Sequence, residues 1–388
     1  MSNVLTDSVS VATGFSPSVR QAVRHAARLA AVDAEQADRE RRLSIRTAAA
    51  VSAAGLPGYF VPQRWGGRDG SFAGLFADAA ALGEGCSSAA WCGALWATHG
   101  RYAAHLPEEG QWELWGACPN VRIAAALTPP SGVAMPEGSG WRLHGTWHFV
   151  SGVDFADWVL LAAPEPGQHG GRIRVLLVPA EQVTVLDTWD STGMRGTGSH
   201  TAVVKDAFVP RHRSFLMDEL LLIEGTGERG ERYAVPAHLA GGTTFCAAAL
   251  GAARGALELW SRWAGSKATG SGRSNHESAA VRETLATASA HIDAAELLLT
   301  RAAYRADTEL VTPLLVAGNQ RDAAVAVDLL VGAVDRMLRI GGAHMRGAGD
   351  ELQRRWRDVH TVAAHRVLRL ELVAEAYATA ALGARQDP

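Results

Sequence analysis

The residues best suited to chemistry lie in a short segment, residues 145–158, that has the pattern of a strand followed by a turn. Side chains alternate along a strand, so Trp147, Phe149 and Ser151 would put two aromatic rings and a hydroxyl on one face. That face suits a flat ring. The same pattern also fits an ordinary hairpin with aromatic side chains in its core, so the segment alone leaves both interpretations open.

Histidines elsewhere in the chain could supply acid–base chemistry. His99 follows Trp91 by eight residues, about two helical turns, so the two side chains could line one wall. His360 and His365 would point about 140° apart on a helix, so at most one of them is expected to face a given site. A histidine titrates near neutral pH and can take a proton from a phenol or hold it in a hydrogen bond. Each of these residues also fits a purely structural place in a core or on a surface.

The overall composition excludes several classes of protein. The 388 residues carry 37 Lys and Arg against 40 Asp and Glu, so no basic excess is present to pair with a nucleic acid. No apolar run approaches the length of about 18 residues needed to span a membrane, and the first residues lack the pattern of a signal peptide. We therefore expect a cytoplasmic protein without a membrane or nucleic-acid partner. The four cysteines form no CxxC pair, so neither a disulfide framework nor a metal site is expected: Cys86, Cys92, Cys118 and Cys246.

The elements that would position these residues fall into three regions. Residues 1–120 carry helical periodicity with Pro and Ser start signals. Residues 121–224 consist mainly of short apolar runs separated by Gly, Pro, Asp and Ser, which predicts a compact antiparallel barrel or sandwich. Residues 225–388 hold long, Ala- and Leu-rich segments nearly free of Pro, which predicts a helical bundle. The fold class is therefore α+β. The long helices are expected at residues 243–264, 278–307, 317–340 and 351–382.

Five motifs in the same order give the chain a resemblance to a known family. The Trp-x-Phe-x-Ser-Gly segment that ends near Trp158 resembles the flavin-contacting strand of the acyl-CoA dehydrogenase fold. Within that fold, the form of the motif found here resembles the one in two-component, reduced-flavin-dependent monooxygenases. The resemblance implies an N-terminal helical domain, a middle antiparallel β-barrel or sandwich and a C-terminal four-helix bundle. The five segments are residues 125–129, 147–158, 193–199, 208–210 and 339–342.

The resemblance also implies which residues bind the cofactor. Ser151 would hydrogen-bond near flavin N5, and Leu127 and Thr128 would bond the edge of the isoalloxazine ring. Basic residues would contact the phosphate, and a Gly-Gly turn would approach the flavin of a neighbouring subunit. The expected cofactor-binding residues are Trp91, Leu127, Thr128, Trp147, Phe149, Ser151, Lys267, Arg273, Gly341 and Gly342.

The catalytic residues that the resemblance implies are Ser151, His99 and His365. Dehydrogenases of this fold often use a glutamate shortly after an Arg-Asp pair, whereas the corresponding position here is Arg366, which cannot act as a base. The monooxygenases resemble this segment in having a histidine after the Arg-Asp pair, placed over the flavin. Of the two histidines here, we select His365 over His360 as the residue that faces the flavin. His99 would help to orient and deprotonate a phenol.

We therefore expect a homotetrameric monooxygenase that hydroxylates an aromatic, phenolic or polyketide-like small molecule with O2. Its cofactor would be reduced FMN, in preference to FAD, supplied by a separate reductase, including by diffusion of the free flavin. Two alternatives share the fold: N-hydroxylation of an amine or amino sugar, and acyl-CoA oxidation. A third alternative is a binding or scaffold protein that has lost its chemistry, against which the presence of Ser151, His99 and His365 argues.

Overall fold

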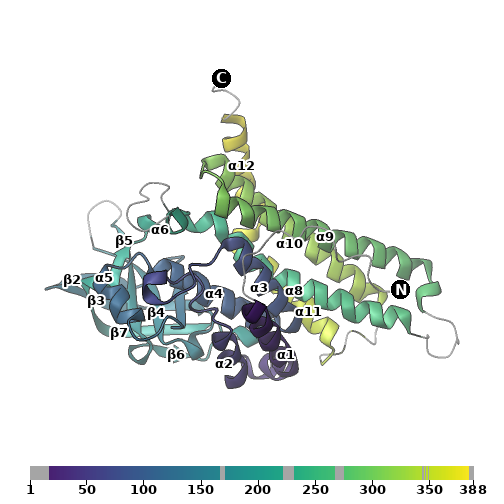
Figure 1. Cartoon of the computed structure of the whole chain (residues 1–388), viewed down its shortest axis with the longest axis horizontal. Helices are drawn as coiled ribbons and strands as arrows, with labels where there is room; N and C mark the ends of the chain where they lie inside the picture. Colours follow the sequence, from purple (N-terminus) through teal and green to yellow (C-terminus); the bar gives the residue numbers. More distant parts are fainter. Residues whose placement is uncertain are drawn as a thin grey trace.

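The computed structural model describes residues 17–166, 171–221, 231–266, 275–342 and 349–383, together with residues 345 and 347. Along the chain, helices come first, then strands, then helices (Figure 1). This order and the α+β class agree with the sequence prediction. In Figure 1 the strands gather at one end of the molecule and the long C-terminal helices extend toward the other, with the N-terminal helices against both.

Small and capping residues shape the N-terminal helices. The hydroxyls of Ser44 and Ser71 accept the N–H groups of Thr47 and Gly74, which caps two of these helices. Nearly every side chain of the helix that follows Cys86 is buried, because it lies between the strands and the other helices. The helices are α1 (Pro17–Glu40), α2 (Ile45–Ala53), α3 (Phe72–Gly85), α4 (Ser87–Ala103) and α5 (Glu108–Trp115).

The strands form two four-stranded sheets with the orders β1-β4-β5-β8 and β2-β3-β7-β6. All neighbours are antiparallel except β1 and β4, which are parallel. The sequence did not predict β2 or β8, which are short. The strands are β1 (Ile123–Ala126), β2 (Val133–Glu137), β3 (Gly140–Val150), β4 (Trp158–Pro164), β5 (Ile173–Pro179), β6 (Thr184–Leu186), β7 (His200–Pro210) and β8 (Ser214–Leu216).

The first sheet is buried on both faces, which explains the uninterrupted apolar run of β4. Val159 and Leu161 pack between the two sheets. Leu160 and Ala162 point the other way, into a core shared with the N-terminal helices. A strand that is covered on both sides needs apolar residues at every position rather than at alternate ones. The two sheets therefore form a sandwich, and the helices cover the outer face of its first sheet.

The C-terminal helices pack against the N-terminal ones in one large core. Gly83 of α3 faces Gly251 of α8 where these two helices pack together. A Cβ on Gly251 would lie 2.4 Å from the carbonyl oxygen of Ala80. The helices of this region are α6 (Asp218–Leu221), α7 (Glu231–Ala234), α8 (Ala237–Gly265), α9 (Ala279–Thr308), α10 (Pro313–Ile340), α11 (Glu351–Ala363) and α12 (Leu370–Gly383).

The prediction of one helix over residues 351–382 is wrong. The helix α11 ends at Ala363, a 3-10 turn follows at Arg366–Leu368, and α12 begins at Leu370. His365 has an extended backbone, with φ −65° and ψ 131°, and its ring accepts the N–H of Val367. This local bond replaces a helical one, and no Gly or Pro marks the break.

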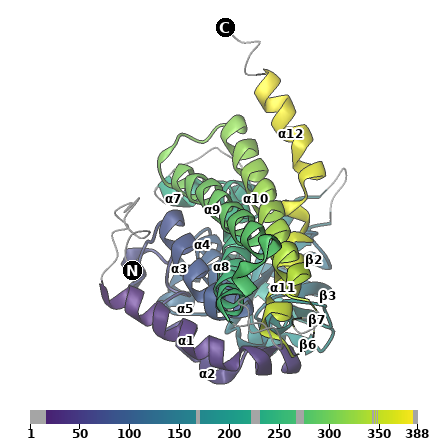
Figure 2. The same cartoon turned by 90° about the vertical axis from the view of Figure 1, so that its right-hand side faces the viewer.

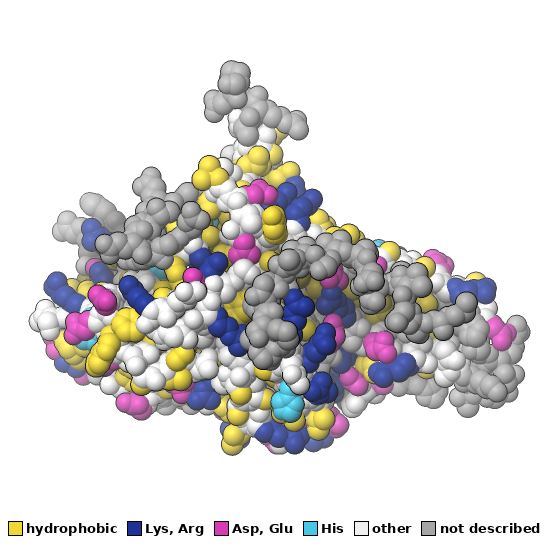
Figure 3. Space-filling model, in the orientation of Figure 1, with side chains coloured by type: hydrophobic (Ala, Val, Ile, Leu, Met, Phe, Trp, Pro, Cys, Tyr) yellow, Lys and Arg dark blue, Asp and Glu magenta, His cyan; other side chains and the backbone are white. Residues whose placement is uncertain are grey.

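The helix α12 projects from the rest of the molecule (Figures 1 and 2). Val373 is its only buried residue. Leu370, Leu372 and Leu382 are exposed, and Figure 3 shows hydrophobic side chains along the projection. This helix of 14 residues packs along α10 but buries only one residue among the described parts of the chain, so it gains little of the apolar burial on which most helices depend.

Candidate active site

A β-bulge near the end of β3 sets the directions of the predicted flavin-facing side chains. Between Trp147 and Val150 the register with β7 shifts by one residue, and Phe149 has φ 62°. The bulge breaks the alternation. Trp147 is 1% exposed and lies between the sheets, where its Nε1 donates to the carbonyl of Ala162 at 2.9 Å. Phe149 is 73% exposed, so the prediction that Trp147, Phe149 and Ser151 share one face is wrong.

Ser151 lies just beyond β3 and begins a line of buried hydroxyls. Its Oγ accepts the indole N–H of Trp91 at 3.0 Å and lies 2.7 Å from Ser199 Oγ. Ser199 Oγ lies 2.7 Å from Thr197 Oγ1, which donates to the carbonyl of Met194 at 2.8 Å. We refer to Ser151, Ser199 and Thr197 as the hydroxyl chain. All three side chains are buried, so protein groups rather than bulk water satisfy their hydrogen bonds.

The glycine-rich turn 193–199 that holds Ser199 and Thr197 is fastened to α11. The carboxylate of Asp358 accepts the N–H of Met194 at 2.6 Å. At Gly193 a Cβ would lie 2.2 Å from the carbonyl oxygen of Arg357, so only glycine allows this approach. Arg357 in turn bonds both carboxylate oxygens of Asp38 on α1. The Arg-Asp pair of the sequence therefore positions the turn. Burial raises the pKa of Asp358 above its usual value.

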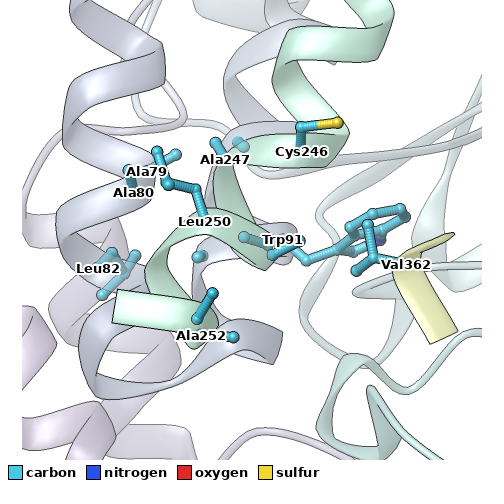
Figure 4. Packing of buried hydrophobic residues seen from close by; sticks show 14 of the residues in the cluster. Ala79, Ala80, Leu82, Trp91, Cys246, Ala247, Leu250, Ala252 and Val362 are labelled. Carbon is cyan, nitrogen blue, oxygen red and sulfur yellow. The ribbon is translucent and has the colours of Figure 1, made fainter. Parts of the chain in front are cut away.

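An aromatic cluster adjoins the hydroxyl chain. The ring of Trp91 stacks on Phe245 of α8 at a centroid distance of 4.9 Å, and His365 lies 4.3 Å from Phe245 and 5.9 Å from Trp91. Figure 4 shows the Trp91 side chain reaching from α4 toward Val362 of α11. We refer to Trp91, Phe245 and His365 as the aromatic cluster. The structure therefore brings together three predicted residues from distant parts of the sequence: Trp91, Ser151 and His365.

Partial burial lowers the pKa of His365 below its usual value, so its neutral form persists to lower pH. Its Nδ1 accepts the N–H of Val367 at 3.5 Å. The proton of neutral His365 is then on Nε2, which makes Nε2 a hydrogen-bond donor. His360 lies on the other side of α11, where its Nε2 is 2.9 Å from Asp335 and its ring packs on Trp356.

His99 lies apart from the aromatic cluster, about 12 Å along α4 from Trp91 at the helical rise per residue. Its Nδ1 lies 2.7 Å from the carbonyl of Ile123, at the start of β1. A carbonyl can only accept, so Nδ1 carries the proton and Nε2 is an acceptor. Burial lowers the pKa of His99 to about 4. Its predicted action on a substrate stays a prediction.

The remaining predicted residues have different positions. Leu127 and Thr128 follow the edge strand β1, and Thr128 is exposed. Gly341 and Gly342 follow α10, and Gly342 has φ 72°, with no atom of the described residues within 4 Å of where its Cβ would lie. Lys267 and Arg273 lie outside the described residues.

Sequence reasoning missed three residues of this region: Phe245, Ser199 and Thr197. The segment 193–199 does contain a signal, because its two hydroxyl residues are spaced two apart. Phe245 lies in an Ala-rich helix and had no such signal. Among the described residues, no group of three or more His, Cys, Asp or Glu side chains could hold a metal ion. No described helix has the length and apolar character needed to cross a membrane.

Comparisons with known proteins agree with this architecture. Residues 243–370 match the family model "Acyl-CoA dehydrogenase, C-terminal domain". The chain is 31% identical to the FADH(2)-dependent resorcinol hydroxylase, oxygenase component, of Rhizobium sp. (strain MTP-10005), over 86% of each chain.

Two solved structures are similar over nearly the whole chain. The 3-HSA hydroxylase from Rhodococcus sp. RHA1 has a TM-score of 0.86 and 26% identity, covering 94% of this chain and 96% of that one. XiaF from Streptomyces sp., in complex with FADH2 and glycerol, has a TM-score of 0.85 and 27% identity, covering 94% and 95%.

Proposed function

This chain belongs to the two-component, reduced-flavin-dependent monooxygenases of the acyl-CoA dehydrogenase fold, and we propose on that premise that it hydroxylates a phenolic small molecule. The predicted family, enzyme class and use of a reduced flavin are confirmed. An oxygenase component of such a system requires a separate flavin reductase and O2. The observation that carries the proposal is the meeting of Ser151 and the aromatic cluster, which contains His365.

The described residues fit a reduced flavin. Ser151 Oγ keeps a lone pair that no described side chain uses, so it can accept an N–H. Phe149, two residues before Ser151, is exposed and its ring centroid lies 6.2 Å from that of Trp189, so the two rings offer aromatic surface. Leu127 and Thr128 supply backbone groups at an edge strand. When bound, the flavin would activate O2, and Ser151 would hold its N5 edge.

The identity of the flavin stays open between FMN and FAD. The sequence favoured reduced FMN. The name of the Rhizobium relative specifies FADH2, and XiaF was solved with FADH2, which supports FAD equally well. Anaerobic titration with both reduced flavins will decide, because the adenine half of FAD adds contacts that FMN lacks. Lys267 and Arg273 remain the proposed phosphate contacts.

Two relatives support a phenolic substrate through their names: a resorcinol hydroxylase and a p-hydroxyphenylacetate 3-hydroxylase. In our proposal the Nε2–H of His365 donates to the substrate oxygen and favours the phenolate, which is the more reactive form of the ring. Proton removal by His365, as the sequence suggested, would need the tautomer that Val367 disfavours. The dehydrogenase alternative loses further support because Arg366, at the place of the dehydrogenase base, is exposed.

We also propose that the chain assembles into a homotetramer in the cytoplasm. The apolar and mostly exposed α12 favours a partner that covers it. The described residues leave the Cα of Gly342 uncovered on its Cβ side, which is compatible with its predicted contact with a neighbouring flavin. All four cysteines are free, as a reducing compartment would keep them.

The test of the function is a mass-spectrometric screen of phenols for products that gain one oxygen atom. The reaction contains the protein, a flavin reductase, NADH and FMN or FAD, and the control lacks the protein. We expect such a product from at least one phenol. A product only from amines would favour N-hydroxylation, and consumption of acyl-CoA without added oxygen would favour dehydrogenation.

A further inference from the structure

We infer that Ser199 and Thr197 fix the direction of the Ser151 hydroxyl, and that this direction makes the protein select reduced over oxidised flavin. The inference rests on the proposed place of Ser151 at flavin N5. It assigns a positioning role to two residues that would touch no substrate or cofactor.

The direction in which the hydroxyls donate along the hydroxyl chain follows from its Met194 end. The carbonyl of Met194 can only accept, so the proton of Thr197 Oγ1 points to it. Thr197 Oγ1 must then accept from Ser199, and Ser199 must accept from Ser151. At the other end the indole of Trp91 can only donate, and it donates to Ser151. The bond from Trp91 is compatible with this direction but does not impose it, because a serine oxygen can accept twice, so the Met194 end sets the direction.

Backbone hydrogen bonds around the hydroxyl chain keep this arrangement in place. The N–H of Gly152 donates to the carbonyl of Thr197 at 2.8 Å, which ties the end of β3 to the turn. The carbonyl of Met194 also accepts the N–H of Thr197 and the indole N–H of Trp189, each at 3.1 Å. Reversal of the hydroxyl chain would break the bond from Thr197 to Met194 and leave the hydroxyl of Ser151 without an acceptor within the hydroxyl chain, which costs more than a typical hydrogen bond contributes.

Ser151 can therefore only accept a hydrogen bond from a group outside the hydroxyl chain, because its proton already points to Ser199. The N5 atom of a reduced flavin carries a hydrogen and donates, whereas N5 of an oxidised flavin has a lone pair and accepts. An oxygen that can only accept will bind the first and repel the second. Without Ser199, the hydroxyl of Ser151 could turn toward N5 and donate to the oxidised form.

The test is the ratio of the dissociation constants for oxidised and reduced flavin, measured by anaerobic titration of the full chain. We expect Ser199→Ala to lower this ratio by about tenfold, which is the size of one hydrogen-bond preference. Thr197→Val, which removes only the hydroxyl, should lower it to a similar or smaller extent. Ser199→Thr keeps a hydroxyl at this position and should leave the ratio at its wild-type value.

The matched control is Ser214→Ala. Ser214 is a buried serine of β8 whose hydroxyl donates to Arg211 and contacts Arg174, away from the hydroxyl chain. A purely structural loss would weaken both flavin forms together and leave the ratio unchanged. An unchanged ratio in both Ser199→Ala and Thr197→Val would overturn the inference, even if overall affinity fell. If the wild-type protein binds neither reduced FMN nor reduced FAD, the proposed function itself fails.

Discussion

The indole Nε1 of Trp91 lies 3.0 Å from Ser151 Oγ, while the ring of the same residue stacks on Phe245 next to His365. One side chain of α4 thus joins the hydroxyl chain of the β-sandwich to the aromatic cluster of the C-terminal helices. A group bound beside Ser151 would therefore contact elements from all three regions of the sequence. Ser151, on one side of Trp91, is expected to act in the reaction with oxygen, and His365, on the other side, is expected to act on the substrate.

Ser151→Ala should still allow reduced flavin to react with O2 but should release more hydrogen peroxide per flavin oxidised. The variant loses one hydrogen bond to N5, worth about 1 kcal/mol, and this opens the N5 edge to proton loss. The measurement compares peroxide with hydroxylated product in one reaction. Equal yields in the variant and the wild type would show that Ser151 does not protect the oxygen-activating step.

His365→Ala should lower the hydroxylation rate by about 10- to 10²-fold, the size of one lost hydrogen bond to a charged oxygen, with flavin oxidation unchanged. His365→Gln keeps an N–H donor and should retain more activity than His365→Ala if orientation matters most. Burial lowers the pKa of His365, and its ring carries an Nε2–H in both the neutral and the protonated form, so titration of this residue should not lower the wild-type rate as pH falls through about 6.5. His360→Ala is the control. A full rate in His365→Ala, with a loss in His360→Ala or His99→Ala, would reject His365 as the substrate residue.

His99 should make folding stability depend on pH. Its pKa in the folded protein is about 4, below the usual value of about 6.5, so between these values the unfolded chain binds the extra proton. The contribution is therefore present above pH 6.5 and is lost as pH falls toward 4, by roughly 3 kcal/mol at most. Denaturant unfolding of the wild type and His99→Gln at several pH values isolates this share. Parallel curves would contradict the assignment.

Removal of residues 370–388 should abolish the homotetramer, because α12 carries the exposed apolar side chains that a partner would cover. Light scattering gives the assembly state. A shorter truncation, of residues 384–388, leaves α12 intact and serves as the control. If the full-length protein is a monomer at working concentration, the tetramer and the proposed contact of Gly341 and Gly342 with a neighbouring flavin are both excluded.

The order of the elements could be predicted from the sequence because each region has its own period of apolar residues. Two local features that shape the site have no signal in the sequence. The bulge at Phe149 depends on pairing with β7, and the break at His365 depends on a ring-to-backbone bond. Both arise from contacts that periodicity does not encode. For this reason Trp147 was misplaced, whereas Ser151 and His365, singled out by the family resemblance, lie beside the same tryptophan.

The hydrogen bond that the N–H of Met194 donates to Asp358 affects how the molecule unfolds on heating. It fastens the turn of the β-sandwich to α11, while Arg357 fastens the same helix to Asp38 of α1. Helices from both ends of the chain also share one core. The three regions should therefore behave as a single cooperative unit, with one calorimetric transition rather than two or three. The hydroxyl chain would then keep its direction until the whole protein unfolds.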